Sequence, residues 1–218
     1  MLDYAQARRL MVDCQLRTYD VTDAALLAAF DAVPREAFVA PGHEPFAYAD
    51  RDVPASADGA RQALAPMVLA RLIQALAVRP GQRVLDVAGG LGYAAAIMAR
   101  LGADVRGLEA SEALAAEAGR RLAEAGHPVT VHAGPLEAGF AADAPYDAIL
   151  LNGAVEARPD ALVAQLREGG RLACVIGRGR SAKATLFVRG GETAGARSLF
   201  DAAAPLLDAF RVEPAFVF

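Results

Sequence analysis

Residues 83–100, RVLDVAGGLGYAAAIMAR, join a predicted strand, a glycine-rich turn and a predicted helix in one continuous segment. Val84, Leu85 and Val87 form the short apolar run that is typical of a strand buried on both faces, and Tyr93–Arg100 has the alanine-rich composition of a helix. The turn between them offers backbone without Cβ atoms and the free N–H groups of a helix N-terminus. The segment therefore predicts an α/β fold with a ligand site at the turn.

Two acidic residues indicate which ligand the turn would hold. A glycine turn alone is weak evidence, because many such turns in α/β proteins bind nothing, and a purely structural turn remains the alternative. Glu109 ends the next apolar run, about twenty residues after the turn, where a carboxylate can accept hydrogen bonds from ribose hydroxyls. Asp86 adds a second acid on the first strand. Two acids disfavour a phosphate-rich ligand and suit a cationic one, so the pattern favours S-adenosylmethionine over NAD.

The length and composition suit one domain. A chain of 218 residues with 55% hydrophobic residues can bury one core, and two full domains would need more chain. We expect an N-terminal helical and lid region over 1–80 and a Rossmann-like cofactor-binding core over 81–218. Both belong to a single domain over 1–218.

Charge, cysteine count and hydropathy limit the partners. The formal net charge is -4 and the basic residues are scattered, so we expect neither nucleic acid nor a membrane surface as a partner. No apolar run approaches the roughly 20 residues of a membrane span, and the N-terminus lacks a signal-peptide core, which predicts a cytoplasmic protein. The 2 cysteines and 3 histidines have no metal-site spacing, so no metal is expected.

The first eighty residues are predicted to be helical and irregular. Helices are expected over 4–16 and 23–32, with Thr22 as the N-cap of the second, followed by a short turn from Pro34. Ala40 to Pro66 is dense in proline and glycine, which predicts a long loop without regular structure. We expect this loop to lie over the cofactor cleft as a mobile lid. A further helix is predicted over 66–76.

After the glycine turn, strands and helices alternate, which predicts a parallel sheet. The expected strands are 104–108, 129–132 and 146–151, and the expected helices are 111–125, capped by Ser111, and 159–166. Predicted strands at 171–176 and 184–189, and an apolar segment ending at Phe218, have no long helix between them. The fold class is therefore α/β, a doubly wound and mostly parallel sheet with an antiparallel C-terminal hairpin, preceded by an N-terminal helical and loop region. This is the Rossmann-like layout of class I methyltransferases.

Several segments resemble one family over nearly the whole chain. MVDCQL at 11–16, VPREAFV at 33–39 and AYAD at 47–50 resemble N-terminal signatures of the protein-L-isoaspartate O-methyltransferases, which generic methyltransferases lack. VLDVAGGLGYAAAIMARL is similar to the family's cofactor loop, APYDAILL to its fourth strand and QLREGGRLACVIG to its fifth. The spacing between these segments holds without large gaps.

The resemblance implies S-adenosylmethionine-dependent carboxyl methylation of isoaspartyl residues in a protein or peptide substrate, as a repair reaction. A carboxylate is already nucleophilic at neutral pH, so positioning and exclusion of water should carry the rate and no strong base is needed. Catalytic residues are therefore not assigned, and the oligomeric state is not predicted. The cofactor-binding positions that the resemblance implies are Leu64, Ala65, Asp86, Ala88, Gly90, Gly92, Glu109, Ala110 and Leu136.

The chain departs from the family at the site itself. The family loop G-Q-T-I-S-Q/A-P corresponds to ARQALAP at 60–66, so that Gln62 stands in the threonine position and Leu64 in the serine position that is regarded as catalytic. The family's G-D-G after the third strand is Gly-Pro-Leu at 134–136, which replaces an adenine-side carboxylate with Pro135. These departures predict altered or reduced activity.

Two further positions depart from the family more mildly, and three functions remain open for the chain. Ala88 replaces the first glycine of the cofactor turn, and Asn152 replaces a threonine after the fourth strand but can still form hydrogen bonds. The chain could be an active enzyme of the isoaspartyl type, a methyltransferase with another substrate, or a catalytically silent binding or scaffold protein. An NAD oxidoreductase is disfavoured, because no Tyr-x-x-x-Lys is present and Lys183, the sole lysine, lies in a predicted edge hairpin.

Overall fold

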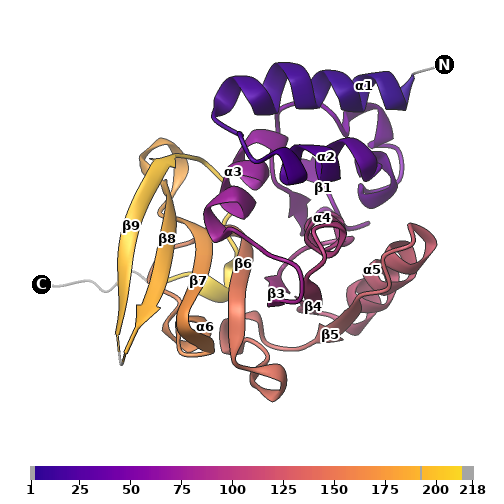
Figure 1. The fold of residues 1–218 in the computed structure, drawn as a ribbon. Coiled ribbons are helices and arrows are strands. Elements are labelled where there is room, and N and C mark those ends of the chain that lie inside the picture. Colours follow the sequence, from indigo (N-terminus) through magenta and orange to yellow (C-terminus); the bar gives the residue numbers. More distant parts are fainter. Residues whose placement is uncertain (1–2, 192, 213–218) are drawn as a thin grey trace, which may run out of the picture.

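A seven-stranded sheet forms the centre of the protein, seen in a computed structural model that describes residues 3–191 and 193–212 (Figure 1). The strand order is β5-β4-β3-β6-β7-β8-β9. The strands span β3 Arg83–Val87, β4 Asp104–Glu109, β5 Thr130–Ala133, β6 Tyr146–Val155, β7 Leu166–Ile176, β8 Lys183–Gly190 and β9 Thr193–Asp201. The predicted α/β fold class is confirmed.

Helices and a small second sheet surround the main sheet. The helices are α1 Tyr4–Met11, α2 Ala24–Ala32, α3 Pro66–Leu76, α4 Tyr93–Arg100, α5 Glu112–Glu124 and α6 Asp160–Val163. The small sheet pairs β1 Val53–Pro54 with β2 Gln62–Ala63 in antiparallel fashion. In Figure 1, α5 lies beside β5 at one edge of the main sheet, and β8 and β9 form the opposite edge.

The strand order reverses at the centre of the sheet and so marks a ligand crevice. The five neighbouring strands β5, β4, β3, β6 and β7 are parallel. From β3 the chain runs outward to β4 and β5 on one side, and then to β6 and β7 on the other side. In open α/β sheets, ligands bind outside the carboxyl ends of the strands at such a reversal. The acids Asp86 on β3 and Glu109 on β4 lie at or near those carboxyl ends.

Both faces of the sheet are buried. Val84 of β3 belongs to one hydrophobic cluster, with residues of α1 to α5, whereas Leu85 belongs to a second cluster that includes residues of α6. Leu150 and Leu151 of β6 divide between the clusters in the same way. Because alternate side chains of a strand point to opposite faces, the continuous apolar runs of the central strands are those of a doubly covered sheet.

The C-terminal part of the sheet is antiparallel, as predicted, but its last strand is β9 and not the apolar segment that ends at Phe218. Strand β8 pairs with β7 and then with β9, so the edge is a three-stranded meander. The pattern of β9 was missed, because most of its residues are exposed or half-buried and no apolar run marks it. The apolar segment ending at Phe218 lies outside the described residues.

Several predicted boundaries are corrected by the structure. The side chain of Asp23, and not Thr22, caps α2, because Asp23 Oδ1 accepts from the N–H of Leu26 at 3.0 Å. The first predicted helix is α1 followed by a π-helical turn over Val12–Leu16. The predicted helix over 159–166 is the shorter α6, since the chain re-enters the sheet at Leu166. Within the described residues, no helix is both long and apolar enough to cross a bilayer.

Candidate active site

The turn after β3 brings two loops into close contact. Gly90 has a φ of +63°, and a Cβ added there would lie 2.8 Å from Ala55 Cβ and 3.1 Å from Arg61 Cγ. Only glycine leaves room for this approach. Ala88 also adopts a left-handed backbone, with a φ of 59°, although it carries a Cβ. The glycine-rich turn is thus covered by the segment around residues 55–61.

Glu109 is the most constrained acid of the site. It ends β4, is 1% exposed, and its Oε1 accepts from the N–H of Gly90 at 2.6 Å. Its Oε2 accepts from Arg61 Nη2 at 3.1 Å and Nε at 3.3 Å, and from the N–H of Ala110 at 3.2 Å. Burial raises the pKa of Glu109, and the Arg61 guanidinium opposes that rise. Both carboxylate oxygens therefore already hold hydrogen-bond donors.

Asp86 forms a second buried polar cluster behind the turn. It is 1% exposed, and its Oδ1 accepts from Asn152 Nδ2 at 2.6 Å. Burial raises the pKa of Asp86 to about 7, against the Asn152 hydrogen bond, which lowers it. Asn152 lies within β6, where the pairing with β7 shifts register between Leu150 and Ala154. Such an irregularity re-aims a side chain, and here it directs Asn152 across to β3.

The segment that covers the turn is a small hairpin with its own polar contacts. Ala55 donates its N–H to the carbonyl of Arg61 at 2.8 Å. Ser56 Oγ accepts from the N–H of Arg61 at 2.9 Å and donates to Asp58 Oδ1 at 2.6 Å. The β1–β2 pairing corrects the prediction that residues 40–66 lack regular structure. These contacts fix the backbone from which Arg61 reaches Glu109.

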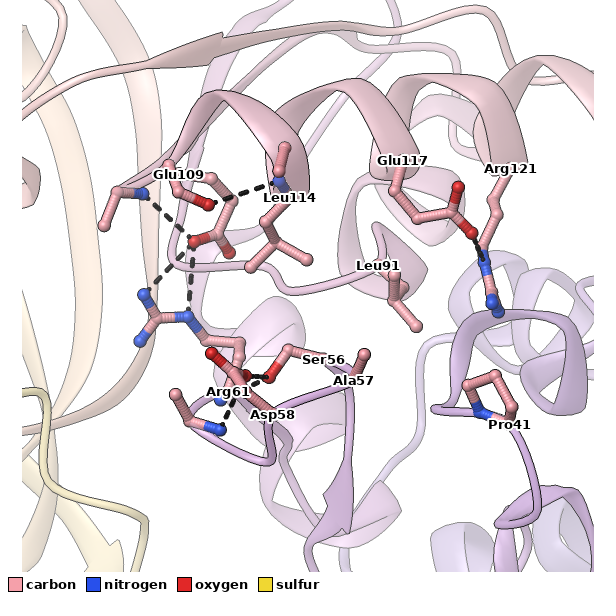
Figure 2. A pocket seen from close by; sticks show the side chains of 14 residues that line it. Pro41, Ser56, Ala57, Asp58, Arg61, Leu91, Glu109, Leu114, Glu117 and Arg121 are labelled. Atoms are coloured by element: carbon pink, nitrogen blue, oxygen red, sulfur yellow. Dashed lines mark hydrogen bonds and ion pairs between the residues drawn. The ribbon is translucent and has the colours of Figure 1, made fainter.

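A cavity of about 470 Å³ adjoins the Glu109–Arg61 pair, between the hairpin and α5. Figure 2 shows Arg61 reaching up from the hairpin toward Glu109, while Glu117 and Arg121 pair with each other on α5. The cavity lining combines apolar residues such as Leu91 with these charged groups. An apolar cavity with a few convergent polar groups is the usual form of a small-molecule site.

The structure brings together some of the predicted site residues and places others in the core. Glu109 and Ala110 line the cavity. Asp86, Gly90 and Gly92, with Glu109, surround a void of about 10 Å³. The remaining four predicted positions do not line the cavity beside Glu109. They are Leu64, 1% exposed, Ala65, whose N–H donates to Asp52, and the buried Ala88 and Leu136.

A buried arginine connects the N-terminal region to this site. Arg35 is 0% exposed, and it donates to the carbonyl of Ala47 at 2.7 Å and to that of Leu64 at 2.7 Å. Its guanidinium lies 4.9 Å from the ring centroid of Tyr93, the first residue of α4. Burial lowers the pKa of Arg35. Arg35 therefore holds together two parts of the lid region and the helix that follows the glycine turn.

The family comparison agrees with this geometry. Residues 6–198 match the model of the protein-L-isoaspartate(D-aspartate) O-methyltransferase family. The chain belongs to this family. It is 46% identical over 178 residues to the protein-L-isoaspartate O-methyltransferase of Methylorubrum populi, covering 81% of this chain and 82% of that protein. A similar protein from Methylorubrum extorquens is 45% identical over 176 residues, 80% of this chain and 76% of that one.

Solved structures of the family share the fold. One protein-L-isoaspartate O-methyltransferase superposes with a TM-score of 0.80 at 26% identity, over 92% of this chain and 65% of that chain. A protein from Plasmodium falciparum, described as a putative protein-L-isoaspartate O-methyltransferase in complex with S-adenosyl-L-homocysteine, has a TM-score of 0.75. It covers 96% of this chain and 100% of that chain at 19% identity, which shows the fold alone.

Two contacts in this member of the family were not predicted from the sequence. Arg61 differs from the glutamine of the motif that residues 60–66 resemble, and this difference marks Arg61 as unusual. The motif does not indicate its partner, because Glu109 is 48 residues away. The Asp86–Asn152 contact joins positions 66 residues apart. Among residues 3–191 and 193–212, no group of three or more His, Cys, Asp or Glu side chains gathers as a metal site would require.

Proposed function

We propose that this chain is an S-adenosylmethionine-dependent protein-L-isoaspartate O-methyltransferase, acting on isoaspartyl residues of proteins or peptides. The observation that carries the proposal is the family match over residues 6–198, together with Glu109 beside the glycine turn. We propose one domain over 1–218, because residues of the N-terminal helices and of the sheet share one hydrophobic cluster.

The residues present fit this cofactor. Glu109 Oε2 accepts from a guanidinium, and ribose hydroxyls are hydrogen-bond donors that the same carboxylate can accept. Gly90, Gly92 and the N-terminus of α4 supply the small turn, and Asp86 adds a second carboxyl group behind it. Ala110 follows β4 and lines the cavity, so it would contribute apolar contact to the cofactor, whereas the buried Leu136 after β5 does not line this cavity.

When bound, the cofactor supplies a methyl group on a sulfonium. The work of the protein is then to orient the substrate carboxylate and to keep water away from it. The hairpin around Ser56 and Arg61 is the segment placed to cover the site, because it already lies against Gly90. A strong general base is not required, which agrees with the absence of a catalytic triad from the sequence motifs.

The substitution at Leu64 predicts slow methyl transfer. Its side chain is buried in the core and has no hydrogen-bond donor for a substrate carboxylate, and losing one such donor commonly costs about a hundredfold or more in rate. Pro135 similarly lacks an acceptor side chain for the adenine amine. We expect turnover on a standard isoaspartyl peptide far below that of the Methylorubrum populi relative, measured side by side. A rate within a few-fold would contradict this prediction.

The buried Leu64 also favours a second candidate, a family member that binds the cofactor or a protein without methyl transfer. One experiment separates the candidates: equilibrium binding of radiolabelled S-adenosylmethionine, followed by transfer to an isoaspartyl peptide and to a mixed protein extract. Binding with transfer to the peptide supports the proposal. Binding with transfer only to other proteins indicates another substrate, and binding without transfer indicates the silent protein. Failure to bind contradicts the proposed cofactor site.

A further inference from the structure

Arg61 contacts the carboxylate that the proposed cofactor site would offer to the ribose hydroxyls. Its Nη2 and Nε both point to the same carboxylate oxygen, Oε2, at 3.1 and 3.3 Å (Figure 2). The Glu109 side chain is 1% exposed and that of Arg61 is 13% exposed, so the pair is largely withdrawn from water. The remaining oxygen, Oε1, accepts from Gly90.

The Glu109 carboxylate cannot accept its present hydrogen bonds from the Arg61 guanidinium and hydrogen bonds from a ribose at the same time. Oε2 also accepts from the N–H of Ala110, so three donors converge on that oxygen. The space over Gly90 is filled as well, since a Cβ there would lie 3.1 Å from Arg61 Cγ. A ligand that uses Glu109 and approaches Gly90 must therefore displace the Arg61 side chain.

Separating the two charges has a cost, because an unpaired carboxylate in a buried position is strongly disfavoured. Arg61 leaves the pair only when other donors reach Glu109. The free energy needed to break the Arg61–Glu109 pair therefore reduces the free energy gained when the cofactor binds. An uncharged glutamine at this position would form a much weaker contact with Glu109.

We infer that Arg61 sets the cofactor affinity of this protein: it is a competing internal ligand that occupies Glu109 in the free state and is displaced when the cofactor binds. The inference rests on the cofactor site proposed above. It assigns to Arg61 a role distinct from those of Leu64 and Pro135, because it acts on binding and not on the transfer step. In the free protein, Arg61 and Glu109 then form a pair, and we call this the paired form.

The test compares Arg61→Gln with the unchanged protein, using S-adenosylhomocysteine as the probe in isothermal titration calorimetry. If the paired form makes up about 90% of the free molecules, removing the pair raises the apparent affinity about tenfold. Arg61→Met also removes the charge but keeps aliphatic atoms over Gly90, so its gain in affinity is expected to be no larger than that of Arg61→Gln. Arg17→Gln breaks the exposed Arg17–Asp13 pair and serves as the matched control, with no change expected.

A second measurement does not depend on ligand. Amide hydrogen exchange over residues 56–63 of the free protein should be faster in Arg61→Gln and Arg61→Met, because the hairpin loses its contact with Glu109. Equal or weaker binding by both variants, or unchanged exchange, would overturn the role of Arg61 and leave the cofactor site standing if the unchanged protein binds. If no variant binds, the cofactor site itself falls, and the role of Arg61 falls with it.

Discussion

Glu109 is held at both of its carboxylate oxygens by groups from other segments of the chain. It holds the backbone of Gly90 through one oxygen and a guanidinium through the other, so its position is fixed before any ligand arrives. A preorganised carboxylate binds with little further ordering of the side chain. Its location at the end of β4 is what the spacing in the sequence predicts.

Glu109→Ala is expected to weaken binding of S-adenosylhomocysteine by about 1.5 to 3 kcal/mol, the usual scale for hydrogen bonds to a charged group. Calorimetry measures this loss, and circular dichroism checks that the variant is folded. Glu112→Ala is the matched control, because Glu112 is an exposed acid in the first turn of α5. Unchanged affinity in Glu109→Ala would remove this residue from the site.

At the residue scale, the sequence predicts positions better than partners. Asp86 and Glu109 are found beside the glycine turn because strand ends and turns are local features of the chain. The partner of each acid comes from another part of the fold, Asn152 for Asp86 and Arg61 for Glu109. Leu64 illustrates the opposite problem: the motif aligns it with a polar site residue, but its side chain is packed in the core.

Helix α2 offers a test at the scale of one element. Asp23→Ala should destabilise the protein by about 1 kcal/mol, because the side chain satisfies the free N–H of Leu26 at the helix start. Thr22→Ala is the matched control and should change stability little, since only the backbone N–H of Thr22 is engaged, by Gln74. Urea denaturation measures both. A larger effect at Thr22 than at Asp23 would contradict the observed cap.

The segment predicted to form a lid, residues 40–66, is partly held by the core. Much of the 40–66 segment is anchored: Ala47, Val53 and Ala55 are each at most 1% exposed. Residues 57–60, at the tip of the hairpin, are exposed, as are residues 41–42, 45–46 and 50–51. Proline and glycine density therefore located the loop but could not show which part of it is held by the core.

Cleavage by an Asp-specific protease tests whether the hairpin tip covers a ligand. We expect cutting before Asp58 in the free protein and slower cutting with saturating S-adenosylhomocysteine, because a closed lid excludes the protease. Mass spectrometry of the fragments identifies the site, and cleavage before Asp208, an exposed aspartate outside the cavity lining, is an internal reference. Equal rates at Asp58 with and without ligand would count against the lid.

At the scale of the whole molecule, alternation of strands and helices was sufficient to predict the parallel sheet, because parallel strands need a long crossover connection, which is usually a helix. The order of the strands and the position of β9 could not be predicted from this alternation. They depend on which edge each crossover chooses, and an exposed edge strand carries no continuous apolar run. The fold class was therefore predictable, whereas the extent of the antiparallel edge was not.

The buried carboxyl group of Asp86 makes the stability of the whole molecule depend on pH. Its pKa is raised to about 7, first by burial, and Glu109 adds to the rise. Between about pH 4 and pH 7, the folded protein therefore keeps a proton that the unfolded chain has lost, so the free energy of unfolding falls as pH rises through this window.

Asp86→Asn removes this titration while keeping an oxygen that can accept from Asn152. We expect the variant to gain stability relative to the unchanged protein as the pH is raised from about 5 to about 8, because only the unchanged protein must then bury a carboxylate at this position. Urea denaturation at the two pH values measures the difference, and Asp31→Asn, a change at an exposed aspartate, is the matched control. If the stability difference between Asp86→Asn and the unchanged protein is the same at both pH values, Asp86 does not carry the proton. Glu109, whose pKa burial also raises, would then be the group to replace next.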